Sequence, residues 1–371
     1  MMARPADALV IGGGIQGCST ALQLARRGLR VVLLEKDHVA RHASGVNAGG
    51  VRRLRRHEAE IPLAIAAMEM WYDIETLLEG RQTGFHVTGQ VAVAETQADL
   101  AWATQRAARL RALGYTHEEL LSPAELYEMM PELAPGMEGG LIARGDGAAS
   151  PYHTTMAFRD TALQAGVVIE EGIAVRRLAR ADGLWRAQTD AGTYQAPCVV
   201  NCAGAWAGAL AAQCGEAVPL QPIAPMMMVT SRLPAFLKPV VLGIGRPLSF
   251  KQMPNGTMMI GGGHLGSADL RTNTIRLDFA KLTRSARTAT ELFPLMRAAT
   301  LVRAWGGIES RLPDDIPVIG PSSTEPGLFH AFGFSAHGFQ LGPVIGEIMA
   351  QLVTQGATQH PIAPFAITRF H

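Results

Sequence analysis

The sequence predicts an α/β protein that combines a Rossmann-like domain with an inserted α+β domain built on an antiparallel sheet. Three observations support this fold class. The chain has 371 residues, which is more than one hydrophobic core usually holds. A glycine-rich turn near the start joins a buried strand to a helix. Residues 83–94 and 226–264 alternate apolar and polar positions between turn residues, as antiparallel strands do.

The first segment contains the complete pattern of a dinucleotide-binding βαβ unit. An apolar run at 8–11 predicts a buried strand, a helix follows to about Gly28, and residues 31–34 predict a second strand that ends in Glu35. Between the first strand and the helix, the pattern G-x-G-x-x-G is formed by Gly12, Gly14 and Gly17. Such glycines permit a tight turn, close approach of backbone to a diphosphate, and close helix–strand packing, while the acid binds ribose hydroxyls. We therefore expect a bound dinucleotide with its diphosphate at the helix N-terminus.

The stretch 41–53, RHASGVNAGGVRR, favours FAD over NAD as that dinucleotide. Its small residues are Ser44, Gly45, Ala48, Gly49 and Gly50. NAD enzymes normally continue from the ribose-binding acid into an ordinary crossover helix. A loop of small residues instead lets the backbone run flat beside a diphosphate and a flavin ring, so a NAD-linked dehydrogenase is the less favoured alternative.

Composition excludes several classes of protein. A formal net charge of +1 provides no field that would attract nucleic acid or an anionic membrane. No signal peptide is apparent, because the apolar residues 8–11 enter the glycine turn, and acids interrupt the apolar helix expected at 61–78. The four cysteines are too few for a disulfide scaffold, and no second ligand pair accompanies Cys198 and Cys202. We expect a cytoplasmic protein without a metal site or transmembrane segment.

The predicted elements divide the chain into two discontinuous domains. The nucleotide-binding domain is assigned to residues 1–82, 146–218 and 300–371, and the substrate domain to residues 83–145 and 219–299. In the first domain we expect a helix at 151–165, with strands at 167–170, 173–175 and 196–202 in one parallel sheet. In the second domain we expect amphipathic helices at 98–113 and 279–293.

Several motifs together resemble the D-amino acid oxidase and glycine oxidase superfamily of FAD-dependent oxidoreductases. They are GGGIQG with its distant acid, the loop 44–50, NCAGAW at 201–206, WGGIESRLPDDIPVIG at 305–320 and GFSAHGFQLGP at 333–343. The last is similar to a stretch of the sarcosine oxidases. WGGI followed by PD is similar to the β subunits of heteromeric sarcosine, opine and hydroxyproline oxidases or dehydrogenases. The resemblance implies a glutathione-reductase-type FAD-binding domain with an inserted substrate domain.

The resemblance also implies which residues contact FAD. They are Gly12, Gly14, Ile15, Gln16, Gly17, Glu35, Lys36, Ser44, Asn47, Ala48, Gly49, Gly50, Val175, Ala203, Gly204, Trp206, Gly307, Ile308, His337, Gly338, Phe339, Gln340 and Leu341. Backbone N–H groups of 338–341 would face the pyrimidine edge of the flavin, where negative charge gathers on reduction. Gly307 stands where monomeric sarcosine oxidase has the cysteine that tethers its flavin, so we expect non-covalent FAD.

The substrate-binding candidates depart from the family pattern. Glu309 replaces the arginine of glycine oxidase and D-amino acid oxidase, and Gln340 replaces a lysine of monomeric sarcosine oxidase. Arg52 matches an arginine that sarcosine oxidase places over the flavin, which makes it the expected carboxylate anchor. Glu309 could meet a cationic substrate group or form a structural ion pair. His264 follows a predicted strand and is a further candidate for the pocket; no residue is assigned as catalytic.

The implied reaction is oxidation of the C–N bond of a secondary or D-amino acid of the proline-like, N-alkyl or opine type. Hydride passes to flavin N5 and the resulting imine hydrolyses. Met259 falls near the lysine that promotes the oxygen reaction of monomeric sarcosine oxidase, which favours a dehydrogenase. Two alternatives remain open: a catalytic β subunit that passes electrons to a partner subunit or a quinone, and a flavin-binding protein without turnover.

Overall fold

A six-stranded sheet carries the glycine-rich turn in this computed structural model, which describes residues 6–371. The strand order is β22-β23-β13-β1-β2-β9, and all neighbours are parallel except β22 and β23. The strands are β1 (Ala8–Ile11), β2 (Val31–Glu35), β9 (Val168–Glu171), β13 (Cys198–Asn201), β22 (Val318–Pro321) and β23 (Leu328–Phe332). Because β1, β2 and β13 are central, their carboxyl ends form the edge at which such sheets bind ligands.

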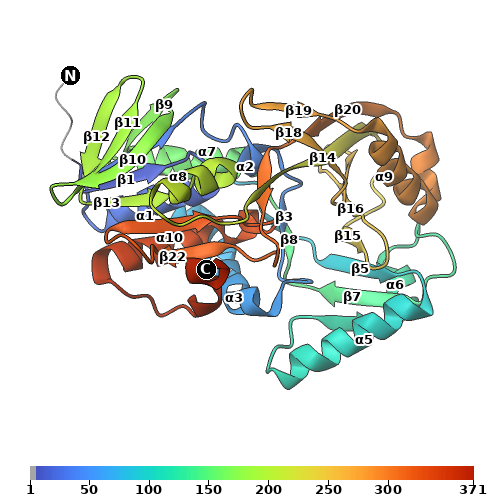
Figure 1. The fold of residues 1–371 in the computed structure, drawn as a ribbon. Coiled ribbons are helices and arrows are strands. Elements are labelled where there is room, and N and C mark those ends of the chain that lie inside the picture. Colours follow the sequence, from blue (N-terminus) through green and yellow to red (C-terminus); the bar gives the residue numbers. More distant parts are fainter. Residues whose placement is uncertain (1–5) are drawn as a thin grey trace.

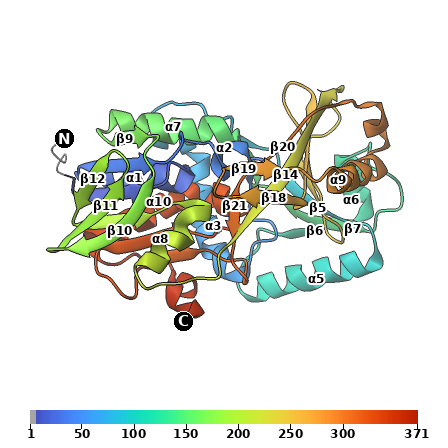
Figure 2. The same ribbon diagram turned by 45° about the horizontal axis from the view of Figure 1, so that its top comes forward.

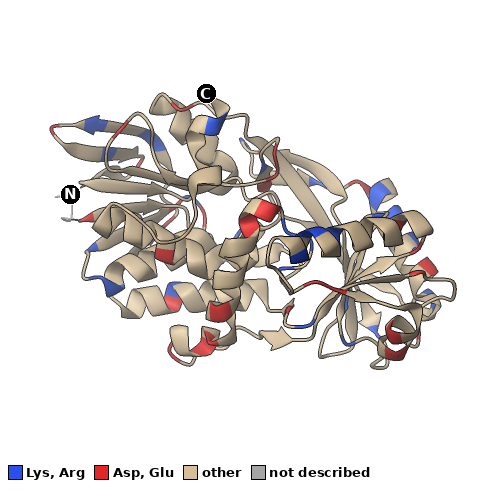
Figure 3. Cartoon of the chain, turned by 90° about the horizontal axis from the view of Figure 1, so that it is seen from below, with Lys and Arg blue, Asp and Glu red and all other residues tan. Residues whose placement is uncertain are grey.

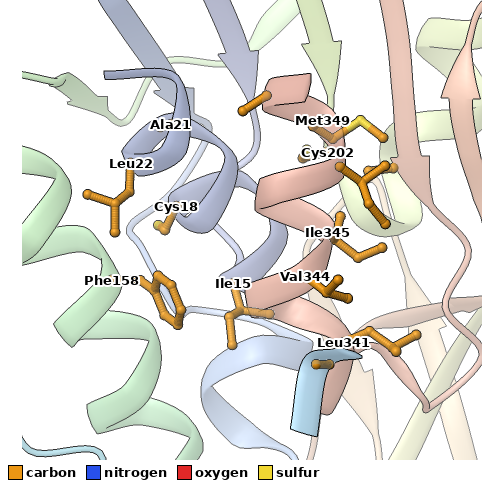
Figure 4. Close-up of a cluster of buried hydrophobic side chains, with 14 of the residues drawn as sticks. Ile15, Cys18, Ala21, Leu22, Phe158, Cys202, Leu341, Val344, Ile345 and Met349 are labelled. Atoms are coloured by element: carbon orange, nitrogen blue, oxygen red, sulfur yellow. The ribbon is translucent and has the colours of Figure 1, made fainter. Parts of the chain in front are cut away.

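Helices cover one face of this sheet. They are α1 (Ile15–Arg26), α3 (Ile61–Tyr72), α7 (Pro151–Gln164) and α10 (Gly338–Gln355). Figure 4 shows the core between them, where Ile15 and Leu22 of α1 lie beside Phe158 of α7 and Ile345 of α10. Since α10 packs directly on α1, the C-terminal segment 333–343 is brought next to the glycine turn.

An antiparallel meander and a short helix cover the opposite face. They are β10 (Val175–Ala181), β11 (Leu184–Thr189), β12 (Gly192–Ala196) and α8 (Ala207–Gln213). Trp185 of the meander shares a core with Leu9 and Leu34 of the sheet. The prediction that 173–175 is a strand of the parallel sheet is wrong, because Val175 begins β10 and pairs with Thr189 of the meander. The chain turns away from the sheet at Gly172, where φ is 74°.

A second, larger sheet forms the other lobe (Figure 1). Its order is β19-β18-β14-β17-β16-β15-β5-β7-β6, with β20 and β21 also paired to β14. The strands are β5 (Gln90–Ala94), β6 (Glu119–Leu121), β7 (Gly139–Ala143), β14 (Gln221–Arg232), β15 (Val240–Gly243), β16 (Ser249–Gln252), β17 (Thr257–Gly261), β18 (Leu265–Asp269), β19 (Thr274–Arg276), β20 (Leu301–Gly306) and β21 (Glu309–Arg311). All pairs are antiparallel except β15 with β5. The helices of this lobe are α5 (Gln97–Ala112), α6 (Pro123–Met129) and α9 (Phe279–Leu292), so both predicted amphipathic helices are confirmed.

The remaining helices and strands are short. They are α2 (Ala43–Val46), α4 (Ile74–Leu77), β3 (Gly50–Val51), β4 (His86–Val87), β8 (Gly147–Ala148), η1 (Glu58–Glu60), η2 (Gly204–Trp206), η3 (Pro294–Ala298), η4 (Ala363–Phe365) and η5 (Ile367–Phe370). In Figure 2, the long strand β14 runs from the region of β21 out along the second lobe. The domain boundary at residue 300 stays a prediction; β20 and β21, which it assigns to the nucleotide-binding domain, hydrogen-bond to β14. The first five residues of that assignment lie outside the described part of the chain.

Figure 3 shows both signs of charge on both lobes. Among the described residues, no helix is long and apolar enough to cross a membrane. Within the same part of the chain, no group of three or more His, Cys, Asp or Glu side chains is arranged as metal ligands would be.

Candidate active site

A cavity of about 1280 Å³ lies between the two lobes and collects most of the predicted residues. Its walls are the carboxyl ends of β1, β2 and β13, the loop after β2, the start of α10, and strands β14, β15 and β17 of the large sheet. Sites for drug-sized ligands usually enclose 300–1,000 Å³. A cavity of this size can therefore hold a dinucleotide together with a small substrate. Of the predicted FAD-binding residues, all but Gly17, Gly307 and Leu341 line it.

The glycine turn leaves no space for side chains. Gly12 has φ of 110°, and a Cβ there would lie 2.4 Å from the carbonyl oxygen of Cys202. A Cβ on Gly17 would lie 1.8 Å from the carbonyl oxygen of Gly12, which explains why this glycine packs strand against helix and does not line the cavity. Gly14 precedes α1, whose first turn contains no acid. Its N-terminus is therefore suited to an anion such as a diphosphate.

Glu35 ends β2 beside this turn. Its Oε2 accepts a hydrogen bond from Gly13 N at 2.6 Å, and its Oε1 accepts one from Asp37 N at 2.8 Å. Burial raises the pKa of Glu35, and these two backbone donors act in the opposite direction. The position fits the predicted ribose contact, which stays a prediction.

A polar cluster lies beyond Glu35, and sequence reasoning identified only some of its members. Lys36 lies over the Trp206 ring, with Nζ 3.9 Å from the ring centroid, and donates to Asn273 Oδ1 at 2.6 Å. The His42 ring packs at a tilt against the same indole, with 4.8 Å between centroids, and His42 contacts Asp37 through Nε2 at 2.9 Å. Asn273 lies in the turn between β18 and β19, far along the chain, so no local pattern could have associated it with this part of the cavity.

The small-residue loop is shaped by its own side chains. Asn47 Oδ1 accepts from Gly49 N at 2.7 Å, and a Cβ on Gly49, where φ is 70°, would lie 2.2 Å from the Ala149 carbonyl oxygen. A Cβ on Gly307 would lie 2.5 Å from Val46 Cγ2. Position 307 is thus closely packed against the loop and carries no thiol, which is consistent with the prediction of non-covalent FAD.

Two of the four arginines at 52–56 are held by protein partners. Arg53 Nε donates to the buried Asp146 at 3.0 Å. Arg56 donates to Gln340 Oε1 at 2.9 Å and to the His337 carbonyl oxygen at 2.8 Å. The Arg53 guanidinium thus connects this loop to the turn between β7 and β8, and the Arg56 guanidinium connects it to α10. Neither is free for a ligand.

The other two arginines line the cavity and form no ion pair within the described residues. Arg52 donates only to the Leu54 carbonyl oxygen. Burial and the nearby Arg56 lower the pKa of Arg52 to about 9, which still leaves it charged at neutral pH. Arg55 donates to the Gly243 carbonyl oxygen on the large sheet. Either guanidinium can accept a carboxylate from a ligand, and Arg52 has the fewer protein contacts.

The start of α10 presents backbone donors to the cavity, as the segment 333–343 predicts. Gly338, Phe339 and Gln340 line the cavity, and the first turn of this helix contains no acid. A Cβ on Gly338 would lie 2.8 Å from Phe334 Cβ and 2.9 Å from Gln16 Nε2. Glycine here allows the turn to pack against α1 and leaves the helix N-terminus open.

Two predicted substrate-binding residues occupy other places. The Gln340 amide is fully buried, since Nε2 donates to the Ala64 carbonyl oxygen at 2.8 Å and Oε1 accepts from Arg56. Its backbone carbonyl oxygen accepts from Trp71 Nε1 at 2.7 Å, so the side chain and the carbonyl are both occupied. His264 does not line the cavity; its pKa is lowered by burial and by Arg284 and Lys281 of α9.

Glu309, by contrast, lies in the cavity wall on β21. Its Oε1 accepts from Ala336 N at 2.7 Å, immediately before α10. Burial raises the pKa of this carboxyl to about 7. No Lys, Arg or His side chain among residues 6–371 forms an ion pair with it.

Lys251 is a charged residue that sequence reasoning did not select. It lies on β16 directly opposite Met259 of β17, and only 6% of it is exposed. A Cβ on Gly49 would lie 3.1 Å from Lys251 Nζ, so the ammonium adjoins the flavin-side loop. Burial lowers its pKa to about 8, and it has no hydrogen-bond or ion-pair partner in the described chain.

Comparison with known proteins identifies the family. Residues 7–352 match the family described as FAD dependent oxidoreductase (DAO). The chain belongs to this family. FAD is its cofactor, and the fold is that of its relatives. The glycine turn, the acid that ends β2 and the open start of α10 described above fit this cofactor.

Individual relatives span different lengths. The chain is 27% identical to glycine oxidase of Geobacillus kaustophilus, covering 98% of this chain and 97% of that protein. It is 26% identical to monomeric sarcosine oxidase of Arthrobacter sp., over 98% and 96% of the two chains. It is 28% identical to mouse mitochondrial sarcosine dehydrogenase, but spans only 41% of that longer protein. The crystal structure of the Geobacillus glycine oxidase superposes with a TM-score of 0.91 over 98% of this chain. This protein is an FAD-dependent oxidoreductase of the glycine oxidase and sarcosine oxidase type.

Proposed function

We propose that this flavoenzyme oxidises the C–N bond of a secondary or D-amino acid whose carboxylate is held by Arg52. One observation supports this above all: the cavity contains a guanidinium and a carboxylate, Arg52 and Glu309, that have no ion-pair partners among residues 6–371. An amino acid carries the complementary pair of charges. The relatives named for glycine, sarcosine and dimethylglycine are consistent with a small amino acid substrate.

The protein's own contribution is to bind and orient. Arg52 offers a planar fork that matches two carboxylate oxygens, and Arg55 is the alternative anchor on the same cavity. Fixing the carboxylate leaves the α-carbon in one orientation, which supplies much of the rate enhancement in such reactions. FAD, when bound, accepts the hydride from that carbon. The N–H groups that begin α10 would stabilise negative charge that develops next to them.

The electron acceptor is a separate question, and Lys251 bears on it. Met259 alone favoured a dehydrogenase, because no lysine stood at that position in the sequence. Lys251 pairs with Met259 across β16 and β17, so an ammonium is present beside the loop that would border the flavin. A buried positive charge there favours an oxidase, because it would stabilise the anion formed when oxygen takes an electron. A redox partner subunit or a quinone, and the cytoplasmic location, stay predictions.

The proposal is tested by the visible spectrum of the purified holoprotein, followed anaerobically during addition of sarcosine, D-proline, hydroxyproline isomers, D-arginine, opines and glycine. Bleaching by one class would identify the substrate, and admitting air would then separate oxidase from dehydrogenase. A yellow protein that none of these amines bleaches would contradict the proposal for the isolated chain. It would favour a missing partner subunit or a flavin-binding protein without turnover.

A further inference from the structure

We infer that Glu309 accepts the proton that a substrate ammonium must lose before its carbon can be oxidised. The inference rests on the proposed function and goes beyond it, since it assigns a proton-transfer step to a named atom. Glu309 Oε1 is occupied by the N–H of Ala336. Its Oε2 has no hydrogen bond within residues 6–371, yet it is not among the polar atoms sealed without a partner in the protein interior. That oxygen is available to a ligand in the cavity.

The surrounding charges leave Glu309 without a counter-ion. Arg311 on the same strand is paired with Asp315, through Nη2 and Oδ2 at 2.8 Å. His337, in the turn packed against β21, is held by the buried Glu60 through Nδ1 and Oε2 at 3.0 Å. Strand β14 contributes no charge at this point, because Ile223 pairs with Glu309, and the adjoining η2 (Gly204–Trp206) carries no ionisable side chain.

A cation for this carboxylate therefore has to come from the ligand. Arg52 also lines the cavity but forms no ion pair with Glu309. A zwitterionic amino acid carries its cationic nitrogen next to the carboxylate that Arg52 would hold. The Glu309 carboxylate and the Arg52 guanidinium thus present opposite charges to a ligand in the same cavity.

The chemical need for this step is general. Hydride can leave the α-carbon only when the nitrogen has a lone pair to form the C=N bond, whereas amino groups are largely protonated at neutral pH. In the inferred step an N–H bond of the ammonium breaks and an O–H bond forms on Glu309 Oε2; no electrons are gained or lost. A carboxyl that titrates near neutral pH is suited to this task, because an effective base has a pKa near the working pH.

A purely structural role for Glu309 makes a different prediction. Ser335 and Ala336 have φ of 50° and 67°, and the bond from Ala336 N to Glu309 helps to hold this turn before α10. That role requires only an oxygen acceptor, which the amide of Glu309→Gln retains. Proton uptake requires a carboxylate, which the same substitution removes. Glu309→Gln therefore separates the two roles in a protein expected to fold.

The experiment measures the pH dependence of anaerobic flavin bleaching in the holoprotein, using whichever amine of the panel above bleaches the wild-type fastest. The second-order rate constant of the wild-type should rise with pH through about 7. In Glu309→Gln this rise should shift to the higher pKa of the substrate ammonium itself, so that the rate constant at pH 7 falls about 100-fold. At a pH where the free amine predominates, the variant should recover most of the wild-type rate.

Glu58→Gln serves as the matched control. Glu58 does not line the cavity, and the hydrogen bond from Arg109 lowers its pKa, so it stays ionised across the range tested. This variant should keep the wild-type rise near pH 7. The inference is overturned if Glu309→Gln has the wild-type pH profile, or if its rate is low at every pH. Absence of bleaching in the wild-type itself would instead overturn the proposed function on which the inference rests.

Discussion

The two ends of the cavity differ in the chemical groups that they offer to a ligand. At the cofactor end, glycines and helix N-termini present backbone N–H groups, and the acid Glu35 is satisfied by two backbone donors. At the substrate end, the cavity is lined by Arg52 and Glu309, and Lys251 lies nearby beside Gly49; all three are charged side chains without ion-pair partners among the described residues. Backbone donors are suited to a cofactor whose structure does not vary, whereas unpaired charged side chains are suited to a substrate that carries the complementary charges.

This difference has an energetic side. A buried charge without a partner lowers stability, and proteins keep such groups mainly where function needs them. Burial shifts the pKa of Glu309 up to about 7 and that of Lys251 down to about 8, in both cases toward the neutral form. Both shifts reflect the free-energy cost of burying a charge that has no partner.

The largest effect is expected at the cofactor end. Gly17→Ala would place a Cβ 1.8 Å from the Gly12 carbonyl oxygen, so the turn cannot close around a diphosphate. We expect loss of bound FAD, measured as flavin absorbance per protein. Gly28→Ala is the control: φ is 84° but the surroundings are open, so it should retain FAD and lose only about 1–2 kcal/mol of stability. A fully yellow Gly17→Ala protein would contradict the role given to this turn.

The next effect concerns the carboxylate anchor. Arg52→Gln should retain FAD but weaken substrate binding about 100-fold, as removal of one partner of a desolvated charge pair does. Anaerobic spectral titration with the bleaching amine gives the dissociation constant. Arg55→Gln should have the smaller effect, because the Arg55 guanidinium is engaged by the Gly243 carbonyl oxygen. The opposite order would move the anchor to Arg55.

Lys251→Met should separate the two half-reactions. We expect reoxidation by air to slow about 10- to 100-fold, while anaerobic bleaching changes little, because the lost charge acts on the oxygen anion. Stopped-flow absorbance measures both rates. If the wild-type already reoxidises as slowly as the variant, oxygen is not the acceptor and the dehydrogenase alternative is favoured.

The same variant predicts a pH-dependent gain in stability. Burial lowers the Lys251 pKa from 10.5 to about 8, so the unfolded chain binds more protons between these values. Wild-type stability should therefore rise as pH increases through this window. Lys251→Met should be the more stable protein at pH 7, and thermal unfolding should show the difference disappearing toward pH 10.5.

The smallest effect is expected outside the cavity. His264→Ala should change substrate binding and bleaching rates by no more than about twofold, since surface substitutions away from a site rarely matter more. A loss comparable to that of Arg52→Gln would show that the large sheet rearranges when substrate binds.

Sequence and structure agree best where the determining interactions are local. The positions of Gly12, Gly17 and Glu35 could be predicted because a turn between a strand and a helix depends on residues within about one βαβ unit. Val175 was assigned to the wrong sheet because an apolar strand does not reveal its partner. Asn273, which lines the cavity, and Lys251, which lies beside Gly49, were not selected because strand pairing in the second lobe sets their positions.

The sequence alone therefore determined the cofactor end: the glycine spacing, the acid and the small-residue loop permit few other structures. Only the tertiary structure determined which charged side chains are available at the substrate end. Which two of the four neighbouring arginines are left without an ion pair depends on Asp146 and Gln340, which are distant in sequence and bind Arg53 and Arg56. A charge is available to a ligand only when every other part of the fold leaves it uncompensated, and that is a property of the whole chain.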